Sequence, residues 1–305
     1  MKPLIPRAVQ LFLRRNYVRI RMKKYHDIWP INECAATPPS GWSGWPEGKR
    51  FALVLTHDVD TARGAQRCHA LANLEEAFDF RSSFNFVPER YTVLPELRHA
   101  LTARGFEVGV HGLYHDGKYF DSLEIFRERA IKINRYLKEW NAVGFRTPSM
   151  LHKLDWMSAL DILYDASTFD TDPFEPQSDG VGTIFPFFVQ AEKPEQGFVE
   201  LPYTLPQDFT LFVLMKEKTI DVWKKKLEWI AEKGGMALLN THPDYMNFGD
   251  GAMSQEECPA EYYADLLKYI ITMYGQTCWH VLPREMAQWW MTRTQTTGVT
   301  KYFRG

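Results

Sequence analysis

The stretch Phe51-Ala-Leu-Val-Leu-Thr-His-Asp-Val-Asp60 joins an apolar run to two carboxylates. The run 51–56 is rich in strand formers, which is typical of a strand buried on both faces. Side chains two residues apart in an extended chain point to the same side, so Asp58 and Asp60 are expected to face one spot beyond the strand. Sites in α/β proteins lie at this end of the strands. We therefore predict a site here, with a turn capped by the two aspartates as the alternative.

Strand-like and helix-like segments alternate after this stretch. Such alternation favours βα units and a parallel sheet. We predict helices at 66–79, 94–104, 123–140, 154–160, 220–233, 259–274 and 283–291, and strands at 51–56, 82–87, 107–110, 143–145, 163–165, 236–240 and 278–282. Seven or eight parallel strands in one domain fit the α/β class, as a distorted or incomplete (β/α) barrel.

The composition suits one large core and excludes several classes of function. The chain has 305 residues, of which 45% are hydrophobic, enough for a barrel-sized domain. A net charge of -2 predicts no general affinity for nucleic acid. The four cysteines lie far apart and form no Cys-x-x-Cys pair, so neither a zinc-thiolate site nor a disulfide framework is indicated. Reduced thiols in a cytoplasmic protein are the simplest interpretation.

The first 25 residues carry eight Lys or Arg and no acid, interleaved with apolar residues. Arginines interrupt every apolar run, so the segment is too short and too charged to span a membrane, and it lacks the features of a secretory signal. Two interpretations stay open. The segment is either a basic amphipathic helix in peripheral contact with the inner face of the membrane, or an arm that packs on the domain or is partly disordered.

Three regions follow from these patterns. We expect the basic segment and a connector rich in Pro, Gly and Trp to occupy residues 1–48. The barrel domain is expected at residues 49–291 and a C-terminal tail at residues 292–305.

The sequence His111-Gly-Leu-Tyr-His115 directly follows the predicted strand at 107–110. Two histidines four apart lie on one face of a helical turn and also converge from a tight loop, as metal binding requires. One Asp and two His give three protein ligands and leave a position open for water, the pattern of a catalytic zinc site. The pair is weak evidence alone, and its place at a strand end after Asp58 and Asp60 strengthens it.

Three further stretches end predicted strands in the same way. They contain Arg146 in 144–148, Asp165 in 164–168 and His242 in 239–244. Taken singly, each has an explanation without function: Arg146 in a surface ion pair, Asp165 as a turn cap and His242 as an ordinary loop residue. Because the ends of parallel strands meet at one edge of a sheet, their joint placement favours a shared site.

The order of these motifs resembles that of the polysaccharide deacetylase family, also called the NodB homology domain or carbohydrate esterase family four. The resemblance covers roughly residues 49–290. It implies a NodB-like barrel in which Asp58 is the catalytic base. It also implies that Asp60, His111 and His115 bind one divalent metal ion, expected to be zinc.

The remaining motifs take roles from the same resemblance. Arg146, in an Arg-x-Pro motif, is expected to hold Asp58 in place, and Asp165 to hold Arg146 or another site residue. His242, in a Leu-x-x-His motif, is expected to be the general acid. A base, a metal and an acid together suit the hydrolysis of an amide with a poor leaving group.

The first motif departs from the family pattern. The family commonly has Thr-Phe-Asp-Asp-Gly, whereas this chain has Thr56-His-Asp-Val-Asp60. The change is similar to the Asp-x-Asp branch, and the sequence up to Gly64 is similar to that of a deformylase of lipid-linked aminoarabinose. It leaves open which aspartate binds metal and whether the substrate is a polymer. His57 is expected to pack on the side opposite the aspartates.

Substrate contacts are expected near the long stretch 169–198, which is too long for a routine connection and is a candidate cover for the site. Tyr203 and Pro148 are the predicted substrate-binding residues, and Gln207 and Asp208 are candidates for contacts with sugar hydroxyls.

The favoured function is a metal-dependent hydrolase that removes an acetyl or formyl group from the nitrogen of an aminosugar. The expected partner is an acylated aminosugar, linked to a nucleotide or a lipid or oligomeric, and the expected location is cytoplasmic, peripheral to the inner membrane face through residues 1–25. Two alternatives stay open. One is hydrolysis of a small ureide-like amide, and the other is a non-catalytic carbohydrate-binding protein with the same barrel.

Overall fold

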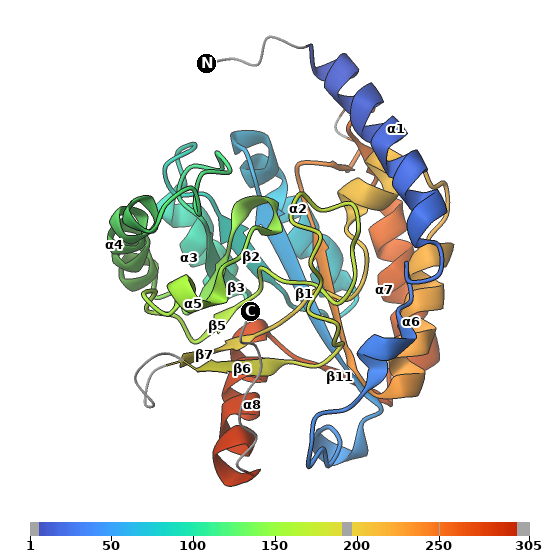
Figure 1. The fold of residues 1–305 in the computed structure, drawn as a ribbon. Helices are drawn as coiled ribbons and strands as arrows, with labels where there is room; N and C mark the ends of the chain where they lie inside the picture. The colour runs from blue at the N-terminus through green and yellow to red at the C-terminus, as the bar shows by residue number, and fades with distance from the viewer. Residues whose placement is uncertain (1–5, 191–196, 250, 298–305) are drawn as a thin grey trace.

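A curled sheet of nine strands forms the centre of the protein (Figure 1). The computed structural model describes residues 6–190, 197–249 and 251–297. Eight strands pair in parallel within these ranges: β1 (Phe51–Val59), β2 (Ser83–Phe86), β3 (Glu107–His111), β4 (Gly144–Arg146), β5 (Tyr164–Asp165), β7 (Gly197–Glu200), β8 (Met236–Thr241) and β11 (Cys278–His280). The ninth, β6 (Phe187–Gln190), runs antiparallel to β7. The predicted incomplete (β/α) barrel is confirmed.

Strand β1 is the centre of this sheet. It pairs along one side with β8 and along the other with β11 near its start and β2 near its end. From β2 the sheet continues through β3, β4, β5 and β7 to β6. Isolated bridges, Phe169 with Tyr203 and Leu205 with Leu239, continue the pairing back to β8. The barrel is therefore nearly closed, and the ends of its parallel strands face one site.

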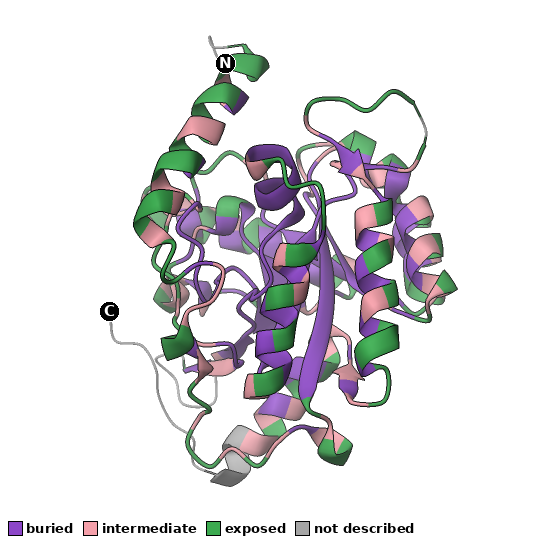
Figure 2. Cartoon of the chain, turned by 90° about the vertical axis from the view of Figure 1, so that its right-hand side faces the viewer, coloured by how far each residue is buried: buried purple, intermediate pink, exposed green. Residues whose placement is uncertain are grey.

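Helices cover the outside of the sheet: α2 (Ala62–Ala77), α3 (Pro95–Ala103), α4 (Leu123–Trp140), α5 (Leu154–Met157), α6 (Asp221–Lys233), α7 (Glu261–Tyr274) and α8 (Pro283–Thr297). Helix α4 shows why the pattern predicted them. Its buried residues Phe126, Ala130, Ile133 and Leu137 recur at steps of three and four, and Ser122 caps its first turn. Figure 2 shows such helices with buried faces toward the sheet and exposed faces outward.

The N-terminal residues 6–48 pack on the barrel. Helix α1 (Arg7–Tyr25) lies along one side (Figure 1) and buries Leu11 and Val18. Two short helices follow, η1 (Glu33–Ala36) and η2 (Pro46–Gly48). Trp42 and Trp45 then contact Trp289 of α8 at centroid distances of 6.1 and 5.4 Å. Of the two interpretations of the basic segment, its described part packs on the domain, which leaves contact with a membrane untested.

Some elements differ from the sequence-based predictions. Helix α8 runs to Thr297, beyond the predicted end at 291, and the remaining residues 298–305 of the predicted tail lie outside the described ranges. Strand β6 lies within the stretch 169–198, to which no strand was assigned, and pairs antiparallel with the next strand, β7. The apolar run Phe209–Met215 forms a buried π-helical segment, η4, since short apolar runs do not distinguish helix from strand.

The smaller elements are η3 (Pro148–Met150), β9 (Met246–Asn247) and β10 (Cys258–Pro259). Among the described residues, no helix is long and apolar enough to cross a membrane.

Candidate active site

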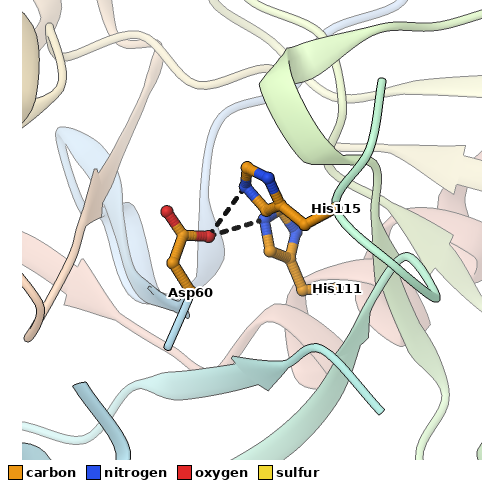
Figure 3. Close-up of side chains that lie close together, drawn as sticks. All are labelled: Asp60, His111 and His115. Carbon is orange, nitrogen blue, oxygen red and sulfur yellow. Dashed lines mark ion pairs between the residues drawn. The ribbon is translucent and has the colours of Figure 1, made fainter. Parts of the chain in front are cut away.

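Three side chains that could bind a metal ion converge at the carboxyl ends of β1 and β3 (Figure 3). Asp60 follows β1, His111 is the last residue of β3, and His115 lies in the loop after it. Asp60 Oδ1 lies 3.4 Å from His111 Nε2 and 2.9 Å from His115 Nε2. All three ligand atoms lie within 4.8 Å of one another. The two predicted histidines and one aspartate are therefore brought together.

The donor set fits a divalent metal ion. Asp60 Oδ1 is buried and accepts no hydrogen bond of good geometry from any described residue. A carboxylate oxygen that faces two imidazole nitrogens without a proton donor is what a bound cation would satisfy. The chemistry of one carboxylate and two imidazoles suits zinc and neighbouring transition metals.

A tight loop, rather than a helical turn, places His115 beside His111. Gly112 has φ 63° and His115 has φ 56°, so the chain reverses direction through left-handed conformations. A Cβ at position 112 would lie 2.5 Å from Pro148 Cδ and 2.7 Å from the hydroxyl oxygen of Tyr119. Glycine is therefore required in this turn by both its backbone angle and its surroundings.

The backbone of β4 orients His111. Its Nδ1 lies 3.1 Å from the carbonyl oxygen of Arg146, a position in which a protonated Nδ1 donates a hydrogen bond. When the ring is neutral, that bond leaves Nε2 without a proton and directed at Asp60, which is the tautomer that a metal ligand needs.

Asp58 is held by hydrogen-bond donors on both of its oxygens. Asn85 Nδ2 and Arg146 Nη1 donate to Oδ1 at 3.0 and 3.1 Å, and Asn240 Nδ2 donates to Oδ2 at 2.8 Å. Burial raises the pKa of Asp58, but the nearby charges of Arg146, His111 and His242 outweigh it and lower the pKa to about 2. Asp58 is thus a fixed, ionised carboxylate, and the unsatisfied Asp60 is the better candidate for the metal ligand.

The predicted contact between Arg146 and Asp58 is present, whereas Asp165 does not hydrogen-bond to Arg146. The Arg146 guanidinium donates to the carbonyl oxygen of Ala166 at 2.6 Å and to Thr56 Oγ1 at 2.9 Å. Asp165 instead accepts hydrogen bonds from the backbone and hydroxyl of Ser167, at 3.0 and 2.7 Å. Ala166 lies between Asp165 and Ser167 in the chain. Asp165 therefore fixes the turn whose Ala166 carbonyl oxygen accepts the hydrogen bond from Arg146.

His242, which follows β8, is oriented by Asp208. Its Nδ1 lies 2.7 Å from Asp208 Oδ1, and its backbone N–H donates to Asp208 Oδ2 at 2.8 Å. Burial lowers the pKa of His242, but the Asp208 carboxylate and then Asp60 and Asp58 raise it to about 10. With Nδ1 engaged, Nε2 is the nitrogen of the imidazolium that remains for a substrate.

A pocket brings these groups together. Its wall includes Asp58, Asp60, His111, His115 and His242. The wall also includes Phe174, Glu175 and Pro176, which belong to the stretch 169–198 that was expected to cover the site. The other lining residues are Arg14, Ser149, Met150, Gln207, Phe209, Thr210 and Tyr245. Among these, only Gln207 was anticipated as a substrate contact.

The two predicted substrate-binding residues lie behind the pocket wall. Tyr203 is 1% exposed, and its hydroxyl donates to Asp172 at 2.8 Å and contacts Glu175 at 3.2 Å. Pro148 is buried below the turn at Gly112. Both residues support groups that line the pocket, namely Glu175 and the histidine loop, and neither lines it.

Asn85 and Asn240 were not assigned to the site from the sequence, and Asp208, predicted as a contact for sugar hydroxyls, is instead buried and holds His242. Asn85 in β2 and Asn240 in β8 are buried polar residues within apolar strands. Such an interruption next to a strand end is a usable signal. Asp208 offers no such signal, because it lies in an irregular segment before η4.

Asp244 joins the first and last motifs. Its Oδ2 accepts a hydrogen bond from the backbone of Asp60 at 2.9 Å, and its Oδ1 accepts one from the Thr61 hydroxyl. A Cβ on Gly64 would overlap with Asp244 Oδ2, so only glycine leaves room for this contact. The contact fixes the backbone from which Asp60 projects.

His57 packs away from the metal-ligating cluster, as expected. Its Nε2 lies 2.9 Å from Glu75 Oε1 and its Nδ1 lies 2.7 Å from Thr241 Oγ1. Glu75 also accepts a hydrogen bond from Ser82 at 2.6 Å. His57 is therefore a buried structural residue that ties α2 to the sheet.

Solved structures share this fold. A Mycobacterium smegmatis protein assigned as a polysaccharide deacetylase has a TM-score of 0.65 at 18% identity, over 88% of this chain and 99% of that chain. A Pseudomonas aeruginosa protein with the same assignment has a TM-score of 0.61 at 16% identity, over 84% and 95%. The Puue allantoinase has a TM-score of 0.63 at 15% identity, over 87% and 96%. No protein-family model and no curated sequence matches the chain.

At these identities the likeness establishes the fold. The chain has the NodB-like fold found in polysaccharide deacetylases, and the resemblance inferred from the motifs is confirmed at this level. An allantoinase also has this fold, so the fold does not determine the activity, which depends on the residues of the site.

Proposed function

We propose that this protein is a metal-dependent hydrolase that removes an acetyl or formyl group from the nitrogen of an aminosugar. One observation carries the proposal: Asp60, His111 and His115, a set able to bind a metal ion, share a pocket with the carboxylate of Asp58 and the imidazole of His242. The carboxylate is suited to accept a proton and the imidazolium to donate one. Amide hydrolysis needs both steps and a means of activating the carbonyl group.

A divalent ion held by Asp60, His111 and His115 would polarise the acyl carbonyl and lower the pKa of water. The protein's own groups perform the proton transfers. Asp58 accepts a proton from the attacking water. The Arg146 guanidinium, whose Nη1 lies 3.1 Å from Asp58 Oδ1, keeps this carboxylate ionised. His242 donates a proton from Nε2 to the departing amine, and Asp208 holds the ring in the required orientation.

The aminosugar would be oriented by polar groups on the pocket wall. Burial raises the pKa of Glu175 to about 8, and its Oε1 accepts a hydrogen bond from Gln207 at 2.7 Å. A protonated Glu175 can both donate to and accept from a sugar hydroxyl. Gln207 and Thr210 offer similar contacts on the same wall.

Hydrolysis of a small ureide is a second candidate function. The fold likeness to the Puue allantoinase favours it, with a TM-score of 0.63. The same water-activating and proton-donating groups would act on a cyclic amide. The chemical class of the substrate, aminosugar or ureide, is therefore the property that separates the two candidates.

An assay of acyl release tests the proposal. We expect protein loaded with zinc to release acetate or formate from N-acetyl or N-formyl aminosugars, presented as free sugars, oligomers and lipid-linked sugars. Allantoin hydrolysis is measured in parallel. Hydrolysis of allantoin without acyl release from any aminosugar would favour the ureide candidate. No product from any aminosugar, with several divalent metals supplied, would contradict the proposal.

As the pH is raised, the Asp208→Asn variant is expected to lose activity earlier, at a lower pH than the wild type does. The Asp208 carboxylate helps to raise the pKa of His242 to about 10. Without that charge the pKa falls, so the proton-donating form of His242 disappears earlier as pH rises. The alkaline limb of kcat should move down by about 1–3 pH units.

The pH profile of kcat checks this prediction. The exposed Asp179 offers a matched control, since Asp179→Asn removes the same charge away from the lining residues of the pocket. An alkaline limb that stays in place in Asp208→Asn would show that His242 does not donate the proton.

A further inference from the structure

Helix α1 carries an apolar stripe on its outer side. The stripe consists of Val9, Phe12, Leu13, Tyr17 and Ile20, which are 45%, 63%, 53%, 46% and 69% exposed. Steps of three and four place these residues on one helix face. They are five of the eleven exposed large hydrophobic residues in the described part of the chain. Apolar exposure is thus concentrated on one helix, most of which is coloured as exposed in Figure 2.

The opposite face of α1 is already fixed to the barrel. Leu11 and Val18 are buried, at 1% and 3% exposure. Arg15 donates to the carbonyl oxygens of Val213, at 3.0 Å, and Gln255, at 3.1 Å. Because these contacts set the rotation of the helix, the outer stripe faces away from the described part of the barrel and remains exposed.

Positive charges flank the outer stripe. Arg19, Lys23 and Lys24 form no ion pair with any described residue. The helix contains no Asp or Glu, and seven of its residues are Lys or Arg. The whole chain nevertheless has a net charge of -2, so the positive charge is concentrated here. An apolar stripe with basic flanks complements an anionic lipid surface in both respects.

The same helix reaches the active-site pocket. Arg14 lines the pocket together with Asp60 and His115, and its guanidinium lies 5.0 Å from the ring centroid of Phe209. Arg14 is the neighbour of Leu13 in the outer stripe. A surface bound by the stripe would therefore lie next to the side of the pocket that Arg14 lines.

We propose that the outer stripe of α1 docks on an anionic lipid bilayer and holds the pocket at the membrane surface, where it receives an aminosugar carried by a lipid. Docking depends only on α1. The choice of a lipid-linked substrate rests on the hydrolase function proposed above. In that complex Arg14 is placed to pair with an acidic group that links sugar and lipid.

Vesicle sedimentation tests the docking. Wild-type protein is expected to sediment with vesicles of mixed phosphatidylcholine and phosphatidylglycerol, and to do so less with pure phosphatidylcholine or in high salt. The Phe12→Gln/Leu13→Gln/Ile20→Gln variant keeps good helix formers and should bind at least about tenfold more weakly. The matched control is Ile131→Gln, which alters a side chain 74% exposed on α4 and should leave binding unchanged.

Other outcomes would overturn the proposal. Wild-type protein that stays in the supernatant with anionic vesicles would do so, as would a triple variant that binds like the wild type. A wild-type dimer in sedimentation velocity without lipid, converted to a monomer by the triple variant, would assign the stripe to self-association. Circular dichroism confirms that the variants remain folded.

The two proposals fail separately. Vesicle binding without acyl release from any aminosugar would sustain the docking and contradict the hydrolase. The opposite result is that the wild type and the triple variant release the acyl group equally from a soluble aminosugar and neither binds vesicles. That result would sustain the hydrolase and contradict the docking. If both hold, the triple variant should lose turnover of the lipid-linked sugar in vesicles and keep turnover of the soluble one.

Discussion

Replacing His111 and His115 together by Ala is expected to leave the protein without a bound divalent ion and without measurable turnover. The described cluster has three ligand atoms within 4.8 Å of one another, and the double variant keeps only the Asp60 carboxylate. One carboxylate does not hold a transition metal against dialysis, because affinity depends on several converging ligands. Elemental mass spectrometry should find close to one ion per wild-type chain and none in the variant.

A matched control is available in the same chain. His26 and His99 are exposed and do not line the pocket, so the His26→Ala/His99→Ala variant removes two imidazoles and should keep the ion. An ion retained by the His111/His115 variant would place the metal elsewhere. A wild-type protein that binds no ion after zinc is added back would instead favour a metal-free amidase or a carbohydrate-binding protein.

The sequence was sufficient to predict the barrel and the convergence of its main polar groups. Strand β1 extends to Val59, so Asp58 and Asp60 follow the alternation of an extended chain, as the pattern required. The ends of β1, β3, β4 and β8 then meet because parallel strands place their carboxyl ends at one edge. Local periodicity and the rules of parallel sheets determine these positions, and no long-range contact has to be known.

Other parts of the site depend on packing between distant segments. Arg14 enters the pocket because α1 folds across η4, and nothing in the basic N-terminal segment indicates which arginine does so. Asp208 meets His242 through the irregular chain between β7 and η4. Tyr203 was expected to contact substrate because it is an aromatic residue near a strand end. It is instead buried, and its hydroxyl contacts Glu175. Burial of such residues is decided by tertiary structure.

The Asp58→Asn variant is expected to keep its metal and to lose turnover by about 10²–10⁴-fold, the usual contribution of a general base. The amide is nearly isosteric and its oxygen can still accept from Asn85 and Arg146. Its NH₂ group would face Asn240 Nδ2, which now donates to Asp58 at 2.8 Å. One buried donor is left without an acceptor, so the free energy of unfolding should fall by about 1–3 kcal/mol. Metal analysis, kcat and thermal unfolding measure the three effects.

Asp60→Asn is the informative comparison, because the sequence left open which aspartate binds the metal. Asp58 has donors on both oxygens, whereas Asp60 Oδ1 is buried without one among the described residues. A cation therefore gains more from Asp60, and Asp60→Asn should weaken metal binding while Asp58→Asn should not. Loss of the ion in Asp58→Asn would reverse the assignment. Unchanged sugar binding in both variants, with no turnover in the wild type, would identify a carbohydrate-binding protein, since only catalysis requires the ionised Asp58 that Arg146 maintains.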